Sequence, residues 1–221
     1  MGKQDSSRCV VKPVFDELIG SGKINDFIKM VIPKKLSIGD IVEIRYSGHG
    51  GEKVIQPRPE FLEWCRHHPE TLRNPDKARE RLNKNPSYKF EGGTHPDVYI
   101  KTTMLTVVIE AKWTEPRITS HTTWRKEGER DQLIRHMDAL LPFEPLKGNG
   151  RVFGLFIVDA HGKISQYVLK QLFASEWYFI RSLPHRVDNG SFREIMSGFC
   201  GVYTWQSIRK TLGLNNPSCI I

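Results

Sequence analysis

The sequence contains no uninterrupted apolar run of about 18 residues, the length that marks a membrane-spanning helix. Its first residues, Met1 to Arg8, are polar and contain no apolar core of the kind that marks a signal peptide. Both absences predict a cytoplasmic protein that stays in the cytosol or on the nucleoid.

Cysteine is scarce, and the four residues present are far apart in the chain: Cys9, Cys65, Cys200 and Cys219. They form no Cys-x-x-Cys pair and no Cys/His cluster, so their spacing is not that of a zinc site. Scattered cysteines of this kind are typical of reduced, cytosolic proteins. The serines lack a Gly-x-Ser-x-Gly elbow, and the glycine-rich loop at 47–51 lacks the Lys-Ser/Thr of a phosphate-binding loop.

The charge balance is basic, with 33 lysines and arginines against 25 acidic residues and a net charge of +8. An excess of this size supports a polyanionic partner, although a solvated surface with a cationic bias would give the same number. Of the 221 residues, 38% are apolar and 26% are charged, which is typical of a globular chain of about one domain.

Hydrophobic periodicity predicts alternating helices and strands. The expected helices span 13–30 (interrupted at 20–22), 59–68, 75–83, 124–141, 164–173 and 204–212, and the expected strands span 41–46, 87–90, 97–101, 105–112, 152–158 and 177–181. This order predicts an α/β fold, with a central mixed sheet flanked by helices and added helical segments at both ends.

Charged residues mark the two ends of the predicted hairpin in the middle of the chain. Asp97 opens the first strand, and Glu110 and Lys112 close the second. Side chains two residues apart on a strand point to the same face, so Glu110 and Lys112 project together. The hairpin brings Asp97 beside them, because the start of its first arm lies opposite the end of its second.

Two clustered carboxylates repel each other, and a hard divalent cation with oxygen ligands offsets that repulsion. The backbone carbonyl of Ala111 is a candidate third ligand. Phosphodiester cleavage needs an activated water and neutralised charge on the phosphate, and a bound metal supplies both. Lys112 is then the group that orients or deprotonates the water and stabilises the transition state.

Pro96-Asp97 and Glu110-Ala111-Lys112, with twelve residues between the two acids, resemble the motif of the PD-(D/E)XK nucleases, the restriction-endonuclease-like superfamily. The resemblance implies a core of one helix, a three-stranded meander, a second helix and a further strand, over residues 59–160. It also implies Mg²⁺ as cofactor, with Mn²⁺ as a substitute, and DNA as substrate. It assigns metal ligation to Asp97 and Glu110 and a catalytic role to Lys112. The alternative is a surface hairpin with an ordinary Glu–Lys pair.

A single domain is expected, divided into an accessory N-terminal segment (1–58), a catalytic core (59–160) and a C-terminal completion of the core (161–221). Members of the superfamily often place a glutamine on the helix after the lysine strand, and Gln132 lies there. The branch with a Gln-x-x-x-Tyr motif would have tyrosine where this chain has His136. An acid of the first core helix often joins the metal site, and Glu60 is preferred, with Glu17 and Glu63 as alternatives.

Basic residues surround the motif, with Trp113 and Trp124 among them. They are candidates for contacts to phosphates, and the tryptophans for stacking on bases, although both tryptophans would also suit a core. The candidate nucleic-acid-binding residues are Arg117, Arg125, Lys126, Arg130 and Arg135.

These inferences together predict a Mg²⁺-dependent endodeoxyribonuclease with Asp97, Glu110, Lys112 and Gln132 in its active site. Two alternatives remain at this point: a nucleic-acid-binding module without catalysis, and a subunit active only within a larger transposition or defence complex. One site per chain would favour a homodimer for an enzyme that cuts both strands of a duplex.

Overall fold

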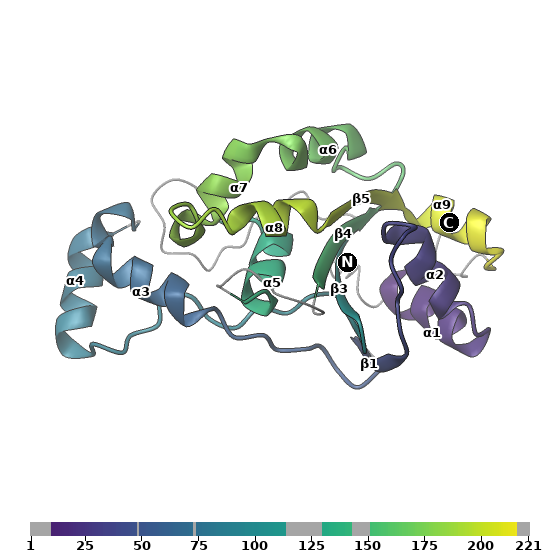
Figure 1. Ribbon diagram of the computed structural model, residues 1–221, viewed down its shortest axis with the longest axis horizontal. Coiled ribbons are helices and arrows are strands. Elements are labelled where there is room, and N and C mark those ends of the chain that lie inside the picture. The colour runs from purple at the N-terminus through teal and green to yellow at the C-terminus, as the bar shows by residue number, and fades with distance from the viewer. Residues whose placement is uncertain (1–9, 48, 73, 114–129, 143–150, 216–221) are drawn as a thin grey trace, which may run out of the picture.

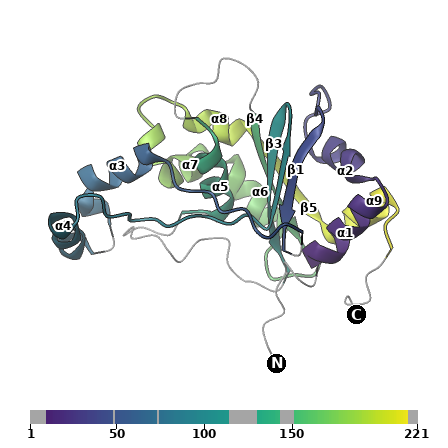
Figure 2. The ribbon, with the colours of Figure 1, turned by 90° about the horizontal axis from the view of Figure 1, so that it is seen from below.

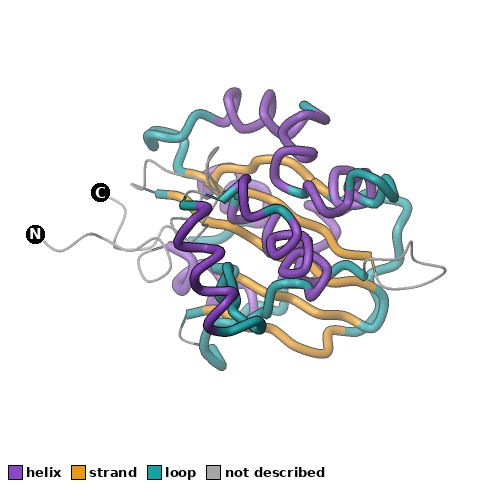
Figure 3. Tube along the Cα trace, turned by 90° about the vertical axis from the view of Figure 1, so that its left-hand side faces the viewer, coloured by secondary structure: helices purple, strands orange, loops and turns teal. Residues whose placement is uncertain are grey.

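A five-stranded mixed sheet forms the centre of the computed structural model, which describes residues 10–47, 49–72, 74–113, 130–142 and 151–215. The strands lie in chain order, with β1–β2 and β2–β3 antiparallel and β3–β4 and β4–β5 parallel. Figure 3 shows the strands side by side behind a layer of helices. The strands are β1 (Ile41–Tyr46), β2 (Val98–Thr102), β3 (Leu105–Lys112), β4 (Arg151–Val158) and β5 (Phe199–Thr204).

Helices cover both faces of the sheet, as Figures 1 and 2 show. One face carries α1 (Lys12–Gly20), α2 (Ile24–Val31) and α9 (Trp205–Leu212), and the other carries α5 (Gln132–Leu140), α6 (Gln166–Ala174), α7 (Glu176–Ser182) and α8 (Phe192–Ser197). Short 3₁₀ turns, η2 (Pro69–Thr71) and η3 (Pro184–Arg186), complete the described elements together with two helices of a separate arm.

Two apolar clusters fill the spaces between the sheet and its helices. On β3, Val107 and Ile109 belong to the cluster under α1, α2 and α9, whereas Val108 belongs to the cluster under α5. This alternation follows from the two-residue period of a strand, and burial of both faces explains the nearly continuous apolar run. Gly154 of β4 lets α5 approach closely, because a Cβ there would lie 2.3 Å from the sulfur of Met137.

An arm of two helices is inserted between β1 and β2. It contains α3 (Pro59–His67) and α4 (Pro75–Lys84), and it projects away from the sheet in Figures 1 and 2. Phe61, Leu72 and Phe90 belong to a small core of its own. The two ends of the insertion meet at a β-bridge between Ile55 and Thr94. This bridge, which we call the neck of the arm, lies beside the start of β2.

The predicted α/β architecture is confirmed: a mixed sheet lies between layers of helices. Residues 1–58 were expected to form an accessory segment, and their described part lies partly in the central sheet and its main core. β1 is a strand of the central sheet, and Phe15 and Phe27 of α1 and α2 are fully buried in the main core. The apolar faces of α1 and α2 are therefore part of what makes the sheet stable.

Three predicted elements differ from the structure. Residues 87–90 form no strand, and 177–181 belong to the helix α7, in which the adjacent residues Tyr178 and Phe179 are both buried. The helix predicted from 124 begins, in its described part, only at Gln132, because Asp131 caps it by accepting the Ile134 N–H. The strand β5 and the helix α8 were not predicted. In the described ranges no helix has the length and apolar character needed to cross a membrane.

Candidate functional site

The hairpin of β2 and β3 places Asp97 beside Glu110. The register pairs Val98 with Ile109, so one step further along the ladder Asp97 lies opposite Glu110, on the sheet face that α5 covers. The Ala111 N–H donates a hydrogen bond of 2.7 Å to Asp97 Oδ2. The predicted meeting of the two acids is thus what the strand register produces.

Glu110 lies at the centre of the polar cluster and is only 3% exposed. Its Oε1 accepts a hydrogen bond of 2.6 Å from Lys112 Nζ, and its Oε2 lies 3.0 Å from His136 Nε2. Burial alone would raise the pKa of Glu110, but the Lys112 charge and the His136 hydrogen bond outweigh it and lower the pKa to about 2. Glu110 is therefore an ionised carboxylate in a nearly dry environment.

The helix α5 brings two side chains to this carboxylate and its lysine. Gln132 Oε1 accepts a hydrogen bond of 2.8 Å from Lys112 Nζ. His136, one turn later on the same face, contacts Glu110 and is only 1% exposed. Sequence reasoning placed Gln132 in the site but did not assign His136 to Glu110. The available signal was the i, i+4 spacing of the two residues.

Asp131, directly before α5, is a second buried acid close to the site. Its Oδ1 accepts the Ile134 N–H at 3.0 Å, and its Oδ2 accepts a hydrogen bond of 2.9 Å from the Tyr178 hydroxyl. Burial, with a further contribution from the negative charge of Glu110, raises the pKa of Asp131 to about 7 despite these hydrogen bonds. The native protein therefore holds a proton here at a pH at which an unfolded aspartate has lost it.

The raised pKa of Asp131 predicts a pH-dependent loss of stability that asparagine should remove. An unfolded aspartate has a pKa of about 3.9, so between about pH 4 and pH 7 the native state binds more protons than the unfolded state, and stability falls as the pH rises. Asparagine keeps the acceptor for the Ile134 N–H and has no charge to bury. We expect the free energy of unfolding of Asp131→Asn to rise relative to that of wild type as the pH increases from 5 to 8. The difference between the two proteins should grow by on the order of 3 kcal/mol over this range.

Urea unfolding of wild type and Asp131→Asn at a series of pH values measures this difference directly. Asp188→Asn, at an exposed aspartate, is the matched control and should follow the wild-type curve. An Asp131→Asn curve parallel to wild type throughout this range would show that Asp131 is ionised in the folded protein.

The donor set of the cluster fits a hard divalent cation. Asp97 and Glu110 are adjacent carboxylates, and Mg²⁺ typically binds through one or two carboxylates while it keeps several waters. Within a strand residue the N–H and C=O point to the same side. Because the Ala111 N–H points to Asp97, the Ala111 carbonyl lies on the side of that carboxylate. No group of three or more acidic, histidine or cysteine ligands occurs among the described residues.

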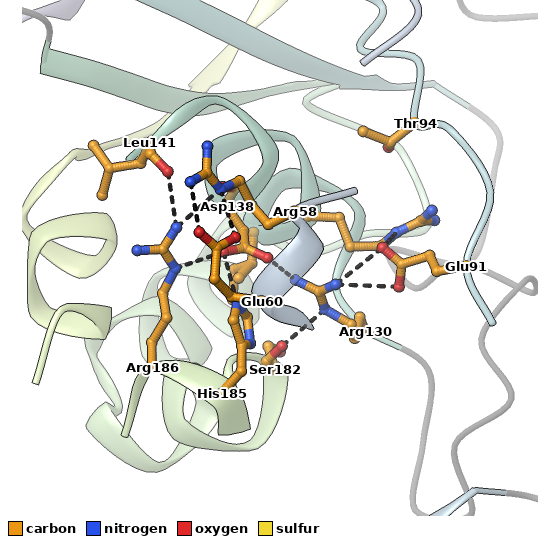
Figure 4. Close-up of polar contacts among 12 residues, drawn as sticks. Arg58, Glu60, Glu91, Thr94, Arg130, Asp138, Leu141, Ser182, His185 and Arg186 are labelled. Carbon is orange, nitrogen blue, oxygen red and sulfur yellow. Dashed lines mark hydrogen bonds and ion pairs between the residues drawn. The ribbon is translucent and has the colours of Figure 1, made fainter. Parts of the chain in front are cut away.

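Glu60 is not brought to this site. It pairs with Arg58 across 3.0 Å on α3 and lies near Arg186, and Figure 4 shows it among these arginines. The expectation that Glu60 joins Asp97 and Glu110 as a metal ligand therefore has no support in the geometry. The alternatives Glu17 and Glu63 also have other partners: Glu17 accepts hydrogen bonds from Asn215, and Glu63 pairs with Arg66 and His67.

Arg130 and Arg135 were expected to contact phosphates, but both lie in the interior, 1% and 5% exposed. Arg130 pairs with Glu91 at 2.9 Å and with Asp138 at 2.5 Å, and Arg135 pairs with Glu91 at 3.1 Å. The structure thus corrects this expectation: the two guanidinium groups neutralise buried carboxylates. Arg117, Arg125 and Lys126 lie outside the described residues.

A buried ionic network extends from these pairs (Figure 4). Asp138 on α5 also accepts a hydrogen bond of 2.6 Å from Arg186 Nε and lies 3.1 Å from His185 Nε2. Burial alone would raise the pKa of Asp138, but His185 and the two arginines lower it strongly. The network connects α5, the neck of the arm and the turn after α7.

No protein-family model matches the chain, and no curated protein or solved structure is significantly similar to it.

Proposed function

We propose that this protein is a metal-dependent endonuclease that hydrolyses DNA phosphodiester bonds with Mg²⁺, in the manner of the PD-(D/E)XK nucleases. The observation that supports the proposal is the convergence of Asp97, Glu110 and Lys112 at one end of the β2–β3 hairpin, with Gln132 on Lys112. An ordinary surface Glu–Lys pair would be solvated, whereas this pair is nearly buried, with side chains 4% and 9% exposed.

The order of elements supports the same proposal. The helix α2, the antiparallel meander β1–β2–β3, the helix α5 and the parallel strand β4 occur in the order that the resemblance implies, with α1 as an extra helix at the start and α3 and α4 inserted between β1 and β2. The meander begins at β1, so the arm is an insertion within this core. The proposed nuclease core therefore begins at residue 12, whereas the sequence analysis expected it to span residues 59–160.

Each residue of the cluster has a task in such a reaction. Asp97, Glu110 and the Ala111 carbonyl would hold Mg²⁺, which when bound supplies charge neutralisation at the phosphate and a water of lowered pKa. Lys112 carries a positive charge beside the ionised Glu110 and can orient the attacking water or stabilise the charge of the transition state. Gln132 fixes the Lys112 ammonium from the side of α5.

DNA is the substrate class that we propose, on the basis of the net charge of +8 and of the resemblance. The proposal is tested by incubating the full chain with supercoiled, linear, single-stranded and branched DNA in Mg²⁺, Mn²⁺ or EDTA. Asp97→Asn is the diagnostic variant, because its amide oxygen still accepts the Ala111 N–H while the ligand charge is lost. Asp188→Asn is the exposed control.

Cleavage that needs metal, is lost in Asp97→Asn and persists in Asp188→Asn would support the proposal. Equal cleavage by wild type and Asp97→Asn, or cleavage in EDTA, would overturn it. Wild type that binds DNA but cuts none of these substrates would favour the nucleic-acid-binding module instead.

A further inference from the structure

Thr94 and His136 form a hydrogen-bonded chain that ends on Glu110. His136 Nε2 lies 3.0 Å from Glu110 Oε2, and its other ring nitrogen, Nδ1, lies 2.7 Å from Thr94 Oγ1. Thr94 is 5% exposed and His136 1%. Water therefore has little access to the imidazole, and its two contacts decide its orientation.

The protonation of this chain follows from the groups at its ends. The Glu110 carboxylate pairs with the Lys112 ammonium through Oε1 and accepts a hydrogen bond through Oε2, so His136 Nε2 carries the hydrogen. Nδ1 of a neutral imidazole with Nε2–H must then be an acceptor, and the Thr94 hydroxyl donates to it. The Glu110 carboxylate and the Thr94 hydroxyl thus favour the same imidazole tautomer from the two sides of the ring.

The position of Thr94 is fixed by the neck of the inserted arm. Its backbone N–H and C=O pair with Ile55 at 2.8 Å and 2.9 Å, across the bridge that joins the two ends of the insertion. His136 is fixed independently, by the helix α5. Glu110 therefore receives a hydrogen bond from a ring that two separate parts of the fold hold in place.

We propose that His136 is a positioning residue that orients the Glu110 carboxylate for metal binding, and that Thr94 enforces the Nε2–H tautomer which this task requires. The inference rests on the proposed function, since it assigns Glu110 to a metal. Groups that hold a ligating carboxylate from outside commonly change metal affinity or activity about 10- to 100-fold when they are lost.

Thr94→Val and Thr94→Ser form the diagnostic pair of variants. Valine matches threonine in shape and keeps the backbone bridge to Ile55 but cannot donate to His136, whereas serine keeps the hydroxyl. Nitrogen-15 NMR of the histidine side chains in the metal-free protein reports the tautomer, and His136→Gln assigns the signal among the 8 histidines. We expect the Nε2–H tautomer in wild type and Thr94→Ser, and its loss or mixture in Thr94→Val.

Calorimetric titration with Mn²⁺ then measures binding without any cleavage. We expect Thr94→Val to bind Mn²⁺ about 10- to 100-fold more weakly than wild type, and Thr94→Ser to stay close to wild type. Equal Mn²⁺ affinity in wild type and Thr94→Val, or an unchanged tautomer in that variant, would overturn the positioning role and leave the nuclease proposal standing. A wild-type protein that binds no Mn²⁺ would overturn both.

Discussion

Under the proposed nuclease function, replacing Lys112 by methionine is expected to lower Mg²⁺-dependent cleavage by roughly 100- to 10,000-fold, the usual range for loss of a group that transfers or holds a proton in the transition state. Methionine fills a similar volume, so the strand β3 and its contacts to β4 remain. The measurement is the initial rate of DNA cleavage at saturating Mg²⁺, with wild type and variant at equal concentration.

A second readout separates a chemical role of Lys112 from a role in holding the metal site together. The ammonium donates to Glu110 at 2.6 Å and competes with a cation for that carboxylate. Methionine removes this competition, so Mn²⁺ affinity should be equal to wild type or higher while cleavage falls. Loss of both Mn²⁺ binding and cleavage would instead mean that Lys112 only maintains the structure of the site.

Lys101 supplies the matched control on the neighbouring strand β2. It is exposed, and its exchange for methionine removes the same charge from the chain. Lys101→Met should cleave at the wild-type rate. Lys112→Arg should not restore activity, because the planar guanidinium is longer and does not reproduce the compact ammonium between Glu110 and Gln132. Full activity in Lys112→Arg would contradict a position-specific role for the amine.

The local periodicity of the sequence was sufficient to predict the hairpin and its cluster. A strand repeats every two residues, so Glu110 and Lys112 had to share a face, and Asp97 had to lie opposite Glu110 once the two arms were paired. The break of the first helix at 20–22 was also a local feature, and it occurs as predicted.

Features that depend on tertiary contacts were not predictable in this way. The arginines at 130 and 135 have the sequence appearance of a basic surface, but Glu91, some 40 residues earlier, draws both into the interior. The hydrogen bond from Thr94 to His136 joins residues 42 positions apart. The strand predicted at 177–181 failed because an apolar run of this length fits a buried helix as well as a strand.

Exchange of Asp138 for asparagine is expected to destabilise the protein by about 3–5 kcal/mol, the range observed when one partner of a buried ion pair is removed. Asp138 accepts hydrogen bonds from Arg130 at 2.5 Å and from Arg186 at 2.6 Å, and all three side chains are at most 2% exposed. Asparagine is nearly the same size but uncharged, so the two guanidinium groups lose the carboxylate that neutralises them in a low-dielectric interior.

Urea unfolding at pH 7 measures this loss, and Asp188→Asn, at an exposed site, should leave the unfolding midpoint unchanged.

A double-mutant cycle with Glu91→Gln makes the test specific to the network, because Arg130 is shared by Glu91 and Asp138. We expect the double variant to lose more stability than the sum of the single variants, since Arg130 then has no buried carboxylate. Additive losses would show that the two acids act independently, and an Asp138→Asn protein as stable as wild type would show that desolvation cancels the attraction. Asp138 lies on the helix that carries Gln132 and His136, so the same network holds the element that brings these two residues to the candidate site.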